Sequence, residues 1–206
     1  MKRFLLFTII LVSALQSSAT IRGGEITYQA LGNNKYAVTF VMYRNCDSST
    51  TTPILKCKVG SSYVPADSQV LISSTDVSGL GASCGVNSRC QGNSGTPFGV
   101  QRLEWAAYFD LNSFSSCEVI FSAEACCRPH DLITFYAPDF YLYASLDQCM
   151  APNTSSSQFL DPFNNFYLCV KKDAFISCSA SGSSYDSLSY EFVHALSSNG
   201  FPNYYY

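Results

Sequence analysis

The sequence predicts an all-β fold: an antiparallel β-sandwich, Ig-like in general architecture and braced by disulfides. Short segments in which apolar and polar residues alternate recur along the chain, and turns rich in Ser, Gly, Asn and Pro separate them. The chain is low in charge, with 13% charged residues, and rich in aromatic residues, at 15%. Its ten cysteines could cross-link such a sandwich.

The first two strands are predicted from the segments EITYQAL and KYAVTFVMY. In each segment apolar side chains occupy every second position, as in a strand with one buried face. The link Gly32-Asn33-Asn34 provides residues that tolerate positive φ, which a tight hairpin turn requires. We therefore expect a β-hairpin that begins near Glu25 and ends close to Cys46.

Further strands are predicted along the rest of the chain from the same alternation. The segments are PILKCKV, QVLISST, LEWAAYFDL, CEVIFSAEAC, FYLYASL, FYLCVKK, AFISCSA and SLSYEFVHAL. The last of these also fits a helix, because Leu188, Phe192 and Ala195 follow helical spacing.

Residues 1–19 have the pattern of a secretory signal peptide. Lys2 and Arg3 precede the apolar run FLLFTIILVSAL, and small residues lead up to a cleavage point after Ala19. The run is shorter than the about 20 residues that a membrane-spanning helix needs. We expect a protein that is secreted, extracellular or at the cell surface, with no membrane span after the signal peptide is removed.

The remaining chain is divided by a stretch rich in Ser, Asn and Pro. We expect an N-terminal β-rich domain over 20–149, a linker or long loop over 150–162, and a second β segment over 163–206 that can be an incomplete sandwich.

Disulfides are the predicted state of the cysteines, because their number is even and an exported chain meets an oxidising compartment. The C-x2–4-C pairs of zinc sites are absent from the sequence. The spacing of Cys84 and Cys90 suits a small cross-linked loop, and Cys126 and Cys127 are expected to bond to different partners. The disulfide candidates are Cys46, Cys57, Cys84, Cys90, Cys117, Cys126, Cys127, Cys149, Cys169 and Cys178.

The charge of the chain argues against nucleic-acid partners. Removal of the leader takes away two of the 12 basic residues, which leaves 10 against 15 acidic residues and a net charge near −5. An acidic chain without basic clusters does not attract a phosphate backbone.

No enzyme, metal or cofactor signature is found in the sequence. The histidines His130 and His194 lie outside paired metal motifs, and there is no G-x-S-x-G elbow. A free catalytic Cys127 beside His130 is less expected than a bonded Cys127. Asp186 and Glu191 are too few to make a calcium loop. We therefore expect a non-catalytic protein without cofactor.

Two alternatives stay open. A glycoside hydrolase could use a carboxylate pair, and the acidic residues available are scattered over Glu104, Asp110, Glu118, Glu124, Asp131 and Asp139. A carbohydrate-binding module could stack a sugar on Trp105 and Tyr108, although core packing is the commoner use of such residues.

Three stretches resemble a known family. GGEITYQALGNNKYAVTFVMYRNC is similar to the first residues of modules in large secreted surface proteins of Bacteroidetes, which reach a Y-R-D-C where this chain has Asn45. CCRPHDLITF resembles their C-C-R-N segment, with Pro129 in place of Asn. DPFNNFYLCV and the stretch up to YEFVHAL are similar to a third segment, in which Asp161 replaces a Ser.

The family resemblance implies a surface or extracellular β-rich module without catalytic activity. Proteins of this kind are described as gliding-motility-associated or adhesin-like and are often exported by type IX secretion. Their acidic cluster is reduced here to Ser183, Ser184, Tyr185 and Asp186, so no metal site is carried over. The expected function is adhesive or structural, with an extracellular polymer, glycan or surface protein as partner.

Overall fold

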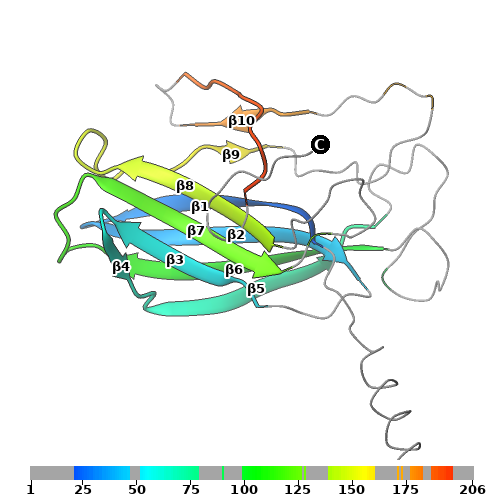
Figure 1. Cartoon of the computed structure of the whole chain (residues 1–206), viewed down its shortest axis with the longest axis horizontal. Coiled ribbons are helices and arrows are strands. Elements are labelled where there is room, and N and C mark those ends of the chain that lie inside the picture. Colours follow the sequence, from blue (N-terminus) through cyan, green and yellow to red (C-terminus); the bar gives the residue numbers. More distant parts are fainter. Residues whose placement is uncertain are drawn as a thin grey trace, which may run out of the picture.

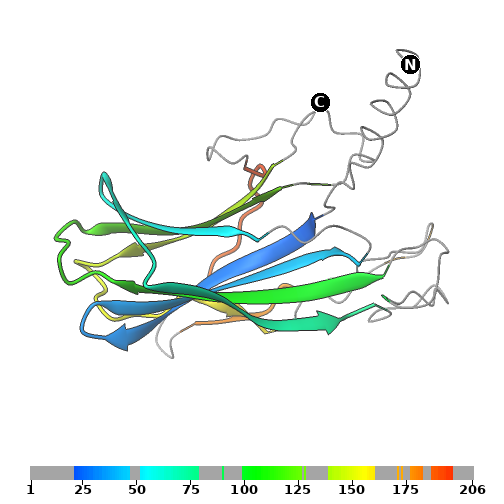
Figure 2. The same ribbon diagram turned by 90° about the horizontal axis from the view of Figure 1, so that it is seen from below.

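Two four-stranded antiparallel sheets packed face to face make up the fold, as Figures 1 and 2 show. The computed structural model describes residues 21–46, 52–78, 90, 99–126, 128, 139–160, 171, 173, 177–182 and 187–196. The described residues contain strands and no helix, which confirms the predicted all-β fold. The finer Ig-like architecture stays a prediction.

Sheet A and sheet B are the two layers. Sheet A has the order β1 (Ile21–Gly32), β2 (Lys35–Asn45), β6 (Val100–Asp110), β5 (Ser68–Asp76). Sheet B has the order β4 (Ser62–Val64), β3 (Ile54–Val59), β7 (Glu118–Cys126), β8 (Asp139–Asp147). A separate two-stranded ribbon pairs β9 (Gln158–Phe159) with β10 (Ala180–Ser181).

The predicted hairpin is present as β1 and β2. Asn33 and Asn34 form the turn with φ of 52° and 53°, and Gly32 beside them has φ of 84°. Positive φ at two central residues is the geometry whose twist matches the flanking strands. The asparagines therefore place β1 and β2 in the register Thr27 opposite Thr39.

An aromatic cluster around Phe121 joins the two sheets. The Phe121 ring, on β7, lies 5.2 Å from the ring of Tyr28 on β1, 5.6 Å from that of Tyr36 on β2 and 5.8 Å from that of Phe109 on β6. Phe121, Tyr36 and Phe109 are at most 1% exposed. These side chains come from alternate positions of their strands, so the period-2 pattern of the sequence becomes the inner face of each sheet.

Two disulfides close the ends of the sandwich. Cys46, just after β2, bonds Cys90, and Cys117, just before β7, bonds Cys149. The Cys46–Cys90 pairing overturns the expected small loop between Cys84 and Cys90. Cys126 is also disulfide-bonded. The candidates Cys84, Cys127 and Cys169 lie outside the described residues.

Two of the disulfide candidates are free thiols, which corrects the prediction that all ten cysteines are bonded. Cys57 lies on β3 between Val64 and Phe121 in the register of sheet B, and it is 0% exposed. It serves as a small core side chain, and burial raises the pKa of its thiol to about 12. Cys178 is free and exposed.

The C-terminal part differs in places from the predicted strands. Residues 187–196 make a single β-bridge, between Leu196 and Tyr141, in place of the expected strand or helix. Phe192 and Val193 are 105% and 78% exposed, so this segment lacks the packing that a strand in a sheet would have. The expected strand FYLCVKK lies mostly outside the described residues.

Part of the predicted linker 150–162 packs against sheet A. Ser155 and Ser156 bond to β1, and Gln158 and Phe159 form β9. The division into domains over 20–149 and 163–206 stays a prediction. The predicted signal peptide, 1–19, lies outside the described residues, and in the described part of the chain no helix has the length and apolar character needed to cross a membrane.

Replacing Phe121 by Ala tests the role of the aromatic cluster. The variant should lose about 3–5 kcal/mol of unfolding free energy, because it removes a buried ring and leaves a cavity between the sheets. Tyr63→Ala is the matched control, since the Tyr63 side chain on β4 is 69% exposed and its loss should cost about 0.5 kcal/mol or less. Chemical denaturation measures both, and equal losses would contradict the account of the core.

Candidate functional site

A groove runs between the edge strands β1 and β8, on one side of the sandwich. Its volume is about 420 Å³, and it is lined by residues 24–28 of β1, 142–145 of β8 and Ser156, Ser157 and Phe159. β1 is the outermost strand of sheet A and β8 is the outermost strand of sheet B. The ribbon in Figure 1 shows β9 lying along the same side.

The β1 edge presents main-chain groups to this groove. Successive residues of an antiparallel strand turn their N–H and C=O groups alternately to one side and the other. Tyr28 turns both groups away from β2, because its N–H donates to Ser156 Oγ at 2.9 Å and its C=O accepts from Ser156 N–H at 2.9 Å. The pairing with β2 runs without a break from Gly23 to Ala30, so Ile26 and Gly24 turn their groups to the same side as Tyr28.

The described residues pair with only part of this edge. Ser155 Oγ accepts from the N–H of Ala30 at 3.1 Å, and Ser156 pairs with Tyr28. As the numbering rises from Ser155 to Ser156, the partner on β1 moves from Ala30 to Tyr28, so this short segment runs antiparallel to β1. It then leaves β1, because Gln158 and Phe159 pair with β10. The main-chain groups of Gly24 and Ile26 that face the groove have no hydrogen-bond partner among the described residues.

The groove has an apolar wall and aromatic residues near it. Leu142 and Ala144 of β8 pack against the buried core and line the groove. Tyr143 is 52% exposed and lies 6.3 Å, ring to ring, from Tyr141 on the same face of β8. Phe159 is 41% exposed. The groove therefore combines main-chain hydrogen-bonding groups with exposed aromatic surface, which is a common composition for recognition sites.

Tyr28 fixes the distance between the two edge strands at one end of the groove. Its hydroxyl donates to the C=O of Ser145 on β8 at 3.4 Å, a long contact. Its ring packs edge-on against Tyr36 at 6.1 Å. Burial raises the pKa of the Tyr28 phenol, and the neighbouring Tyr36 adds to the effect, so the hydroxyl stays protonated and able to donate.

Glu25 is the only acidic residue among the described residues that line the groove. Its side chain lies on the outer face of sheet A, where Val41 stands between it and Glu104 in the strand register. Burial raises the pKa of the Glu25 carboxyl, Arg102 lowers it by attraction, and Glu104 raises it by repulsion. Glu25 is thus a half-buried carboxylate that would gain from a cation or a hydrogen-bond donor beside it.

The predicted stacking pair, Trp105 and Tyr108, does not form a site. Trp105 is 3% exposed and stacks on Phe40 in the core with the ring centroids 5.9 Å apart. Tyr108 is 43% exposed, three residues further along β6, on the outer face of sheet A. The odd spacing places the two rings on opposite faces of the sheet, so they cannot bind one ligand together.

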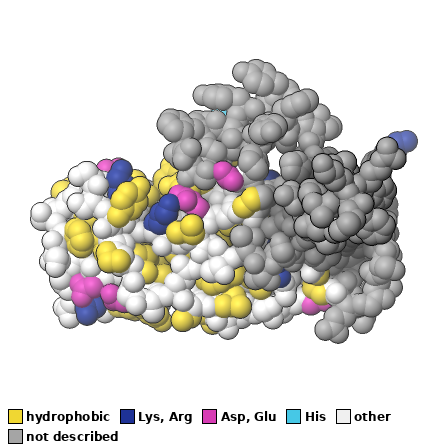
Figure 3. Space-filling model, turned by 60° about the horizontal axis from the view of Figure 1, so that its bottom comes forward, with side chains coloured by type: hydrophobic (Ala, Val, Ile, Leu, Met, Phe, Trp, Pro, Cys, Tyr) yellow, Lys and Arg dark blue, Asp and Glu magenta, His cyan; other side chains and the backbone are white. Residues whose placement is uncertain are grey.

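Three of the carboxylates considered for hydrolysis pair with separate basic residues. Arg102 donates to Glu104 Oε2 at 2.6 Å, Lys35 pairs with Asp110 at 3.2 Å, and Lys56 pairs with Glu124 at 2.8 Å. On the face shown in Figure 3, charged side chains occur in a few small groups with hydrophobic side chains between them. Asp131 lies outside the described residues.

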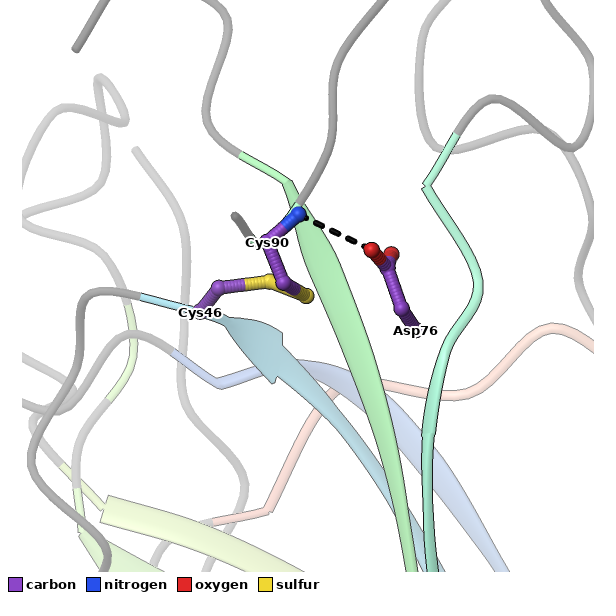
Figure 4. A group of neighbouring side chains, drawn as sticks. All are labelled: Cys46, Asp76 and Cys90. Atoms are coloured by element: carbon purple, nitrogen blue, oxygen red, sulfur yellow. Dashed lines mark hydrogen bonds between the residues drawn. A yellow bond between two sulfur atoms is a disulfide. The ribbon is translucent and has the colours of Figure 1, made fainter. Parts of the chain in front are cut away.

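Two groups of a carboxylate with two cysteines have the spacing of metal ligands, but both contain a disulfide. Cys46, Asp76 and Cys90 lie together in Figure 4, and the sulfur atoms are bonded to each other. The Asp76 carboxylate accepts from the N–H groups of Cys90 and Ser78, each at 2.9 Å. Cysteines in a disulfide supply no thiolate for a metal, so this carboxylate serves to fix the loop.

The second group repeats this arrangement at Cys117, Asp147 and Cys149. Asp147 Oδ1 accepts from the N–H groups of Cys149 and Met150, each at 3.0 Å. It caps the turn that follows β8.

Sequence reasoning missed the groove residues Tyr143 and Phe159. FYLYASL was predicted as a strand, and the alternation of a strand places Tyr141 and Tyr143 on one face. The edge position of that strand carries no local signal, so neither the exposure of the tyrosines nor their closeness to β1 could be derived.

Comparison of the chain with known family models, curated proteins and solved structures finds no match. The resemblance to secreted surface modules therefore stays a prediction.

The variant Glu25→Gln tests the electrostatics beside the groove. A carboxyl whose pKa is raised on folding destabilises the folded state as the pH rises above its unfolded value, here near 4.5, because the folded state holds the proton longer. Unfolding free energies measured between pH about 4 and about 7 should show Glu25→Gln gaining stability relative to the unsubstituted protein as the pH rises. Glu118→Gln, at an exposed position of β7, is the control. A difference that is constant across this range would contradict the raised pKa of Glu25.

Proposed function

We propose that this chain is a secreted or cell-surface β-sandwich module with a non-catalytic, adhesive or structural role. The observation that carries the proposal is the composition of the groove between β1 and β8. It offers main-chain groups, an apolar wall and exposed aromatic surface, with Glu25 as the single acid among its described lining residues. Such a surface suits the holding of a polymer more than glycoside hydrolysis, which in most enzymes uses a pair of carboxyl groups.

The disulfides support the proposed location. Cys46–Cys90 and Cys117–Cys149 join segments that are 44 and 32 residues apart. Bonds of this kind persist in oxidising compartments such as the cell exterior. The aromatic core adds to this, since a sandwich that is cross-linked and packed through large rings resists unfolding outside the cell.

A glycan is the second candidate for the bound polymer. The aromatic residues that favour it are Tyr143 and Phe159, in place of the predicted Trp105 and Tyr108. Exposed rings give flat apolar faces on which a sugar ring can pack.

Binding arrays of glycans and extracellular proteins, probed with the full chain, test the proposed function. We expect saturable binding to at least one polymer, weakened by about two- to tenfold in Tyr143→Ala because an aromatic contact is lost. Tyr63→Ala, which removes an exposed tyrosine from β4, away from the groove, should bind as the unsubstituted protein does.

A parallel assay with chromogenic glycosides separates binding from hydrolysis. The proposal requires that no turnover is seen. Turnover that Glu25→Gln abolishes would contradict it and would assign the groove to a hydrolase.

A further inference from the structure

We propose that the groove captures an extended polypeptide of a partner protein, which adds to sheet A as a strand beside β1. This inference rests on the proposed binding role and names the class of partner. The ligand is recognised first through its main chain, by the N–H and C=O groups of Gly24 and Ile26 that have no partner among the described residues. Strand addition of this kind gives affinity through main-chain hydrogen bonds and specificity through alternate side chains.

The strongest support is that the same edge already accepts an extended segment. Ser156 forms hydrogen bonds with both main-chain groups of Tyr28, and Ser155 bonds the next outward-facing residue, Ala30. A ligand strand placed beside Ile26 and Gly24 would continue this line in the same antiparallel direction. The chain cannot fill the position through its following residues, because Gln158 and Phe159 are paired with β10.

The opposite edge of sheet A is less suited to a ligand strand. β5 exposes Val70, Leu71 and Ile72 by 50% or more, yet its pairing with β6 shifts register between Leu71 and Ser73. A bulge breaks the regular row of donors and acceptors, and proteins use bulges to block edge pairing. β1 has no such break between Gly23 and Ala30, so β1 presents the regular edge.

The residues around the groove define the side chains that the ligand should carry. A residue opposite Ile26 would point inward, as Ile26 does, and meet Leu142 and Ala144, so it should be apolar. The next residue would lie opposite Glu25 and point outward beside its carboxyl. A basic or hydrogen-bond-donating side chain is favoured there, because cross-strand pairs of opposite charge stabilise a sheet.

The partner is therefore an extended segment in which a basic or donor residue is flanked by apolar residues. A capped hexapeptide, Thr-Val-Lys-Val-Thr-Val, is the probe, and Thr-Val-Glu-Val-Thr-Val is its matched control. Titration of the isotope-labelled full chain, followed by amide NMR, should shift the Gly24 and Ile26 resonances. The Lys peptide should bind about three- to fivefold more tightly than the Glu peptide, because the Glu peptide would place a second carboxylate beside Glu25.

Two variants keep the test specific. Glu25→Gln should reduce the preference for Lys over Glu while still binding both peptides. Ile26→Pro removes the outward N–H and should abolish binding of both. The amide resonance of Thr27, which pairs with Thr39 of β2, shows whether this variant keeps the fold. If Ile26→Pro does not fold, the charge preference and its loss in Glu25→Gln still decide the question.

Several results would overturn the inference. One is the absence of shifts at Gly24 and Ile26 up to about 2 mM peptide, a concentration that would detect even a weak complex. Another is equal affinity of the unsubstituted protein for the two peptides. Shifts at Ile26 that depend on protein concentration without peptide would assign the edge to a second copy of the chain instead. If the arrays show polymer binding but neither peptide binds, the strand-addition proposal is wrong and the proposed binding role is retained.

Discussion

The packing of one ring, Phe121, against rings of three strands in the opposite sheet is the interaction on which the architecture depends. Because Phe121 meets Tyr28, Tyr36 and Phe109 between the sheets, the two layers are held by their inner faces. Their edges play no part in this contact, so β1 and β8 are left as edge strands on one side. The groove between them is a consequence of building a core from two open sheets.

The main-chain groups on the open edge of β1 find partners only in part among the described residues. Main-chain N–H and C=O groups need partners, and an uncovered edge invites other strands. Serines 155 and 156 bond to Ala30 and Tyr28, and the chain then turns away into β9. The part of the edge that is left, at Gly24 and Ile26, lies in a groove that also has aromatic surface and a half-buried carboxylate. This combination is why a binding role is preferred to a purely structural one.

Much of the fold could be predicted from the sequence, because alternation and turn chemistry are local. The Asn33-Asn34 turn and seven of the main strands follow from such patterns. The site could not be predicted, because it joins segments more than 100 residues apart, 24–28 and 142–145. Alternation also does not say which face is buried, so Trp105 was a candidate ligand platform although it lies in the core. Ser155 and Ser156 were assigned to a linker because strands were predicted from alternating apolar residues. Polar residues that pair with a strand through hydrogen bonds do not produce that alternation.

Amide hydrogen exchange along β1 tests whether the outer edge of sheet A is open at Ile26 and closed at Tyr28. We expect fast exchange for Ile26, whose N–H faces the groove. Exchange should be slow for Thr27, which pairs with Thr39 of β2, and for Tyr28, which donates to Ser156. Protection of the Ile26 amide equal to that of Thr27 would contradict the account, because the edge would then already be covered.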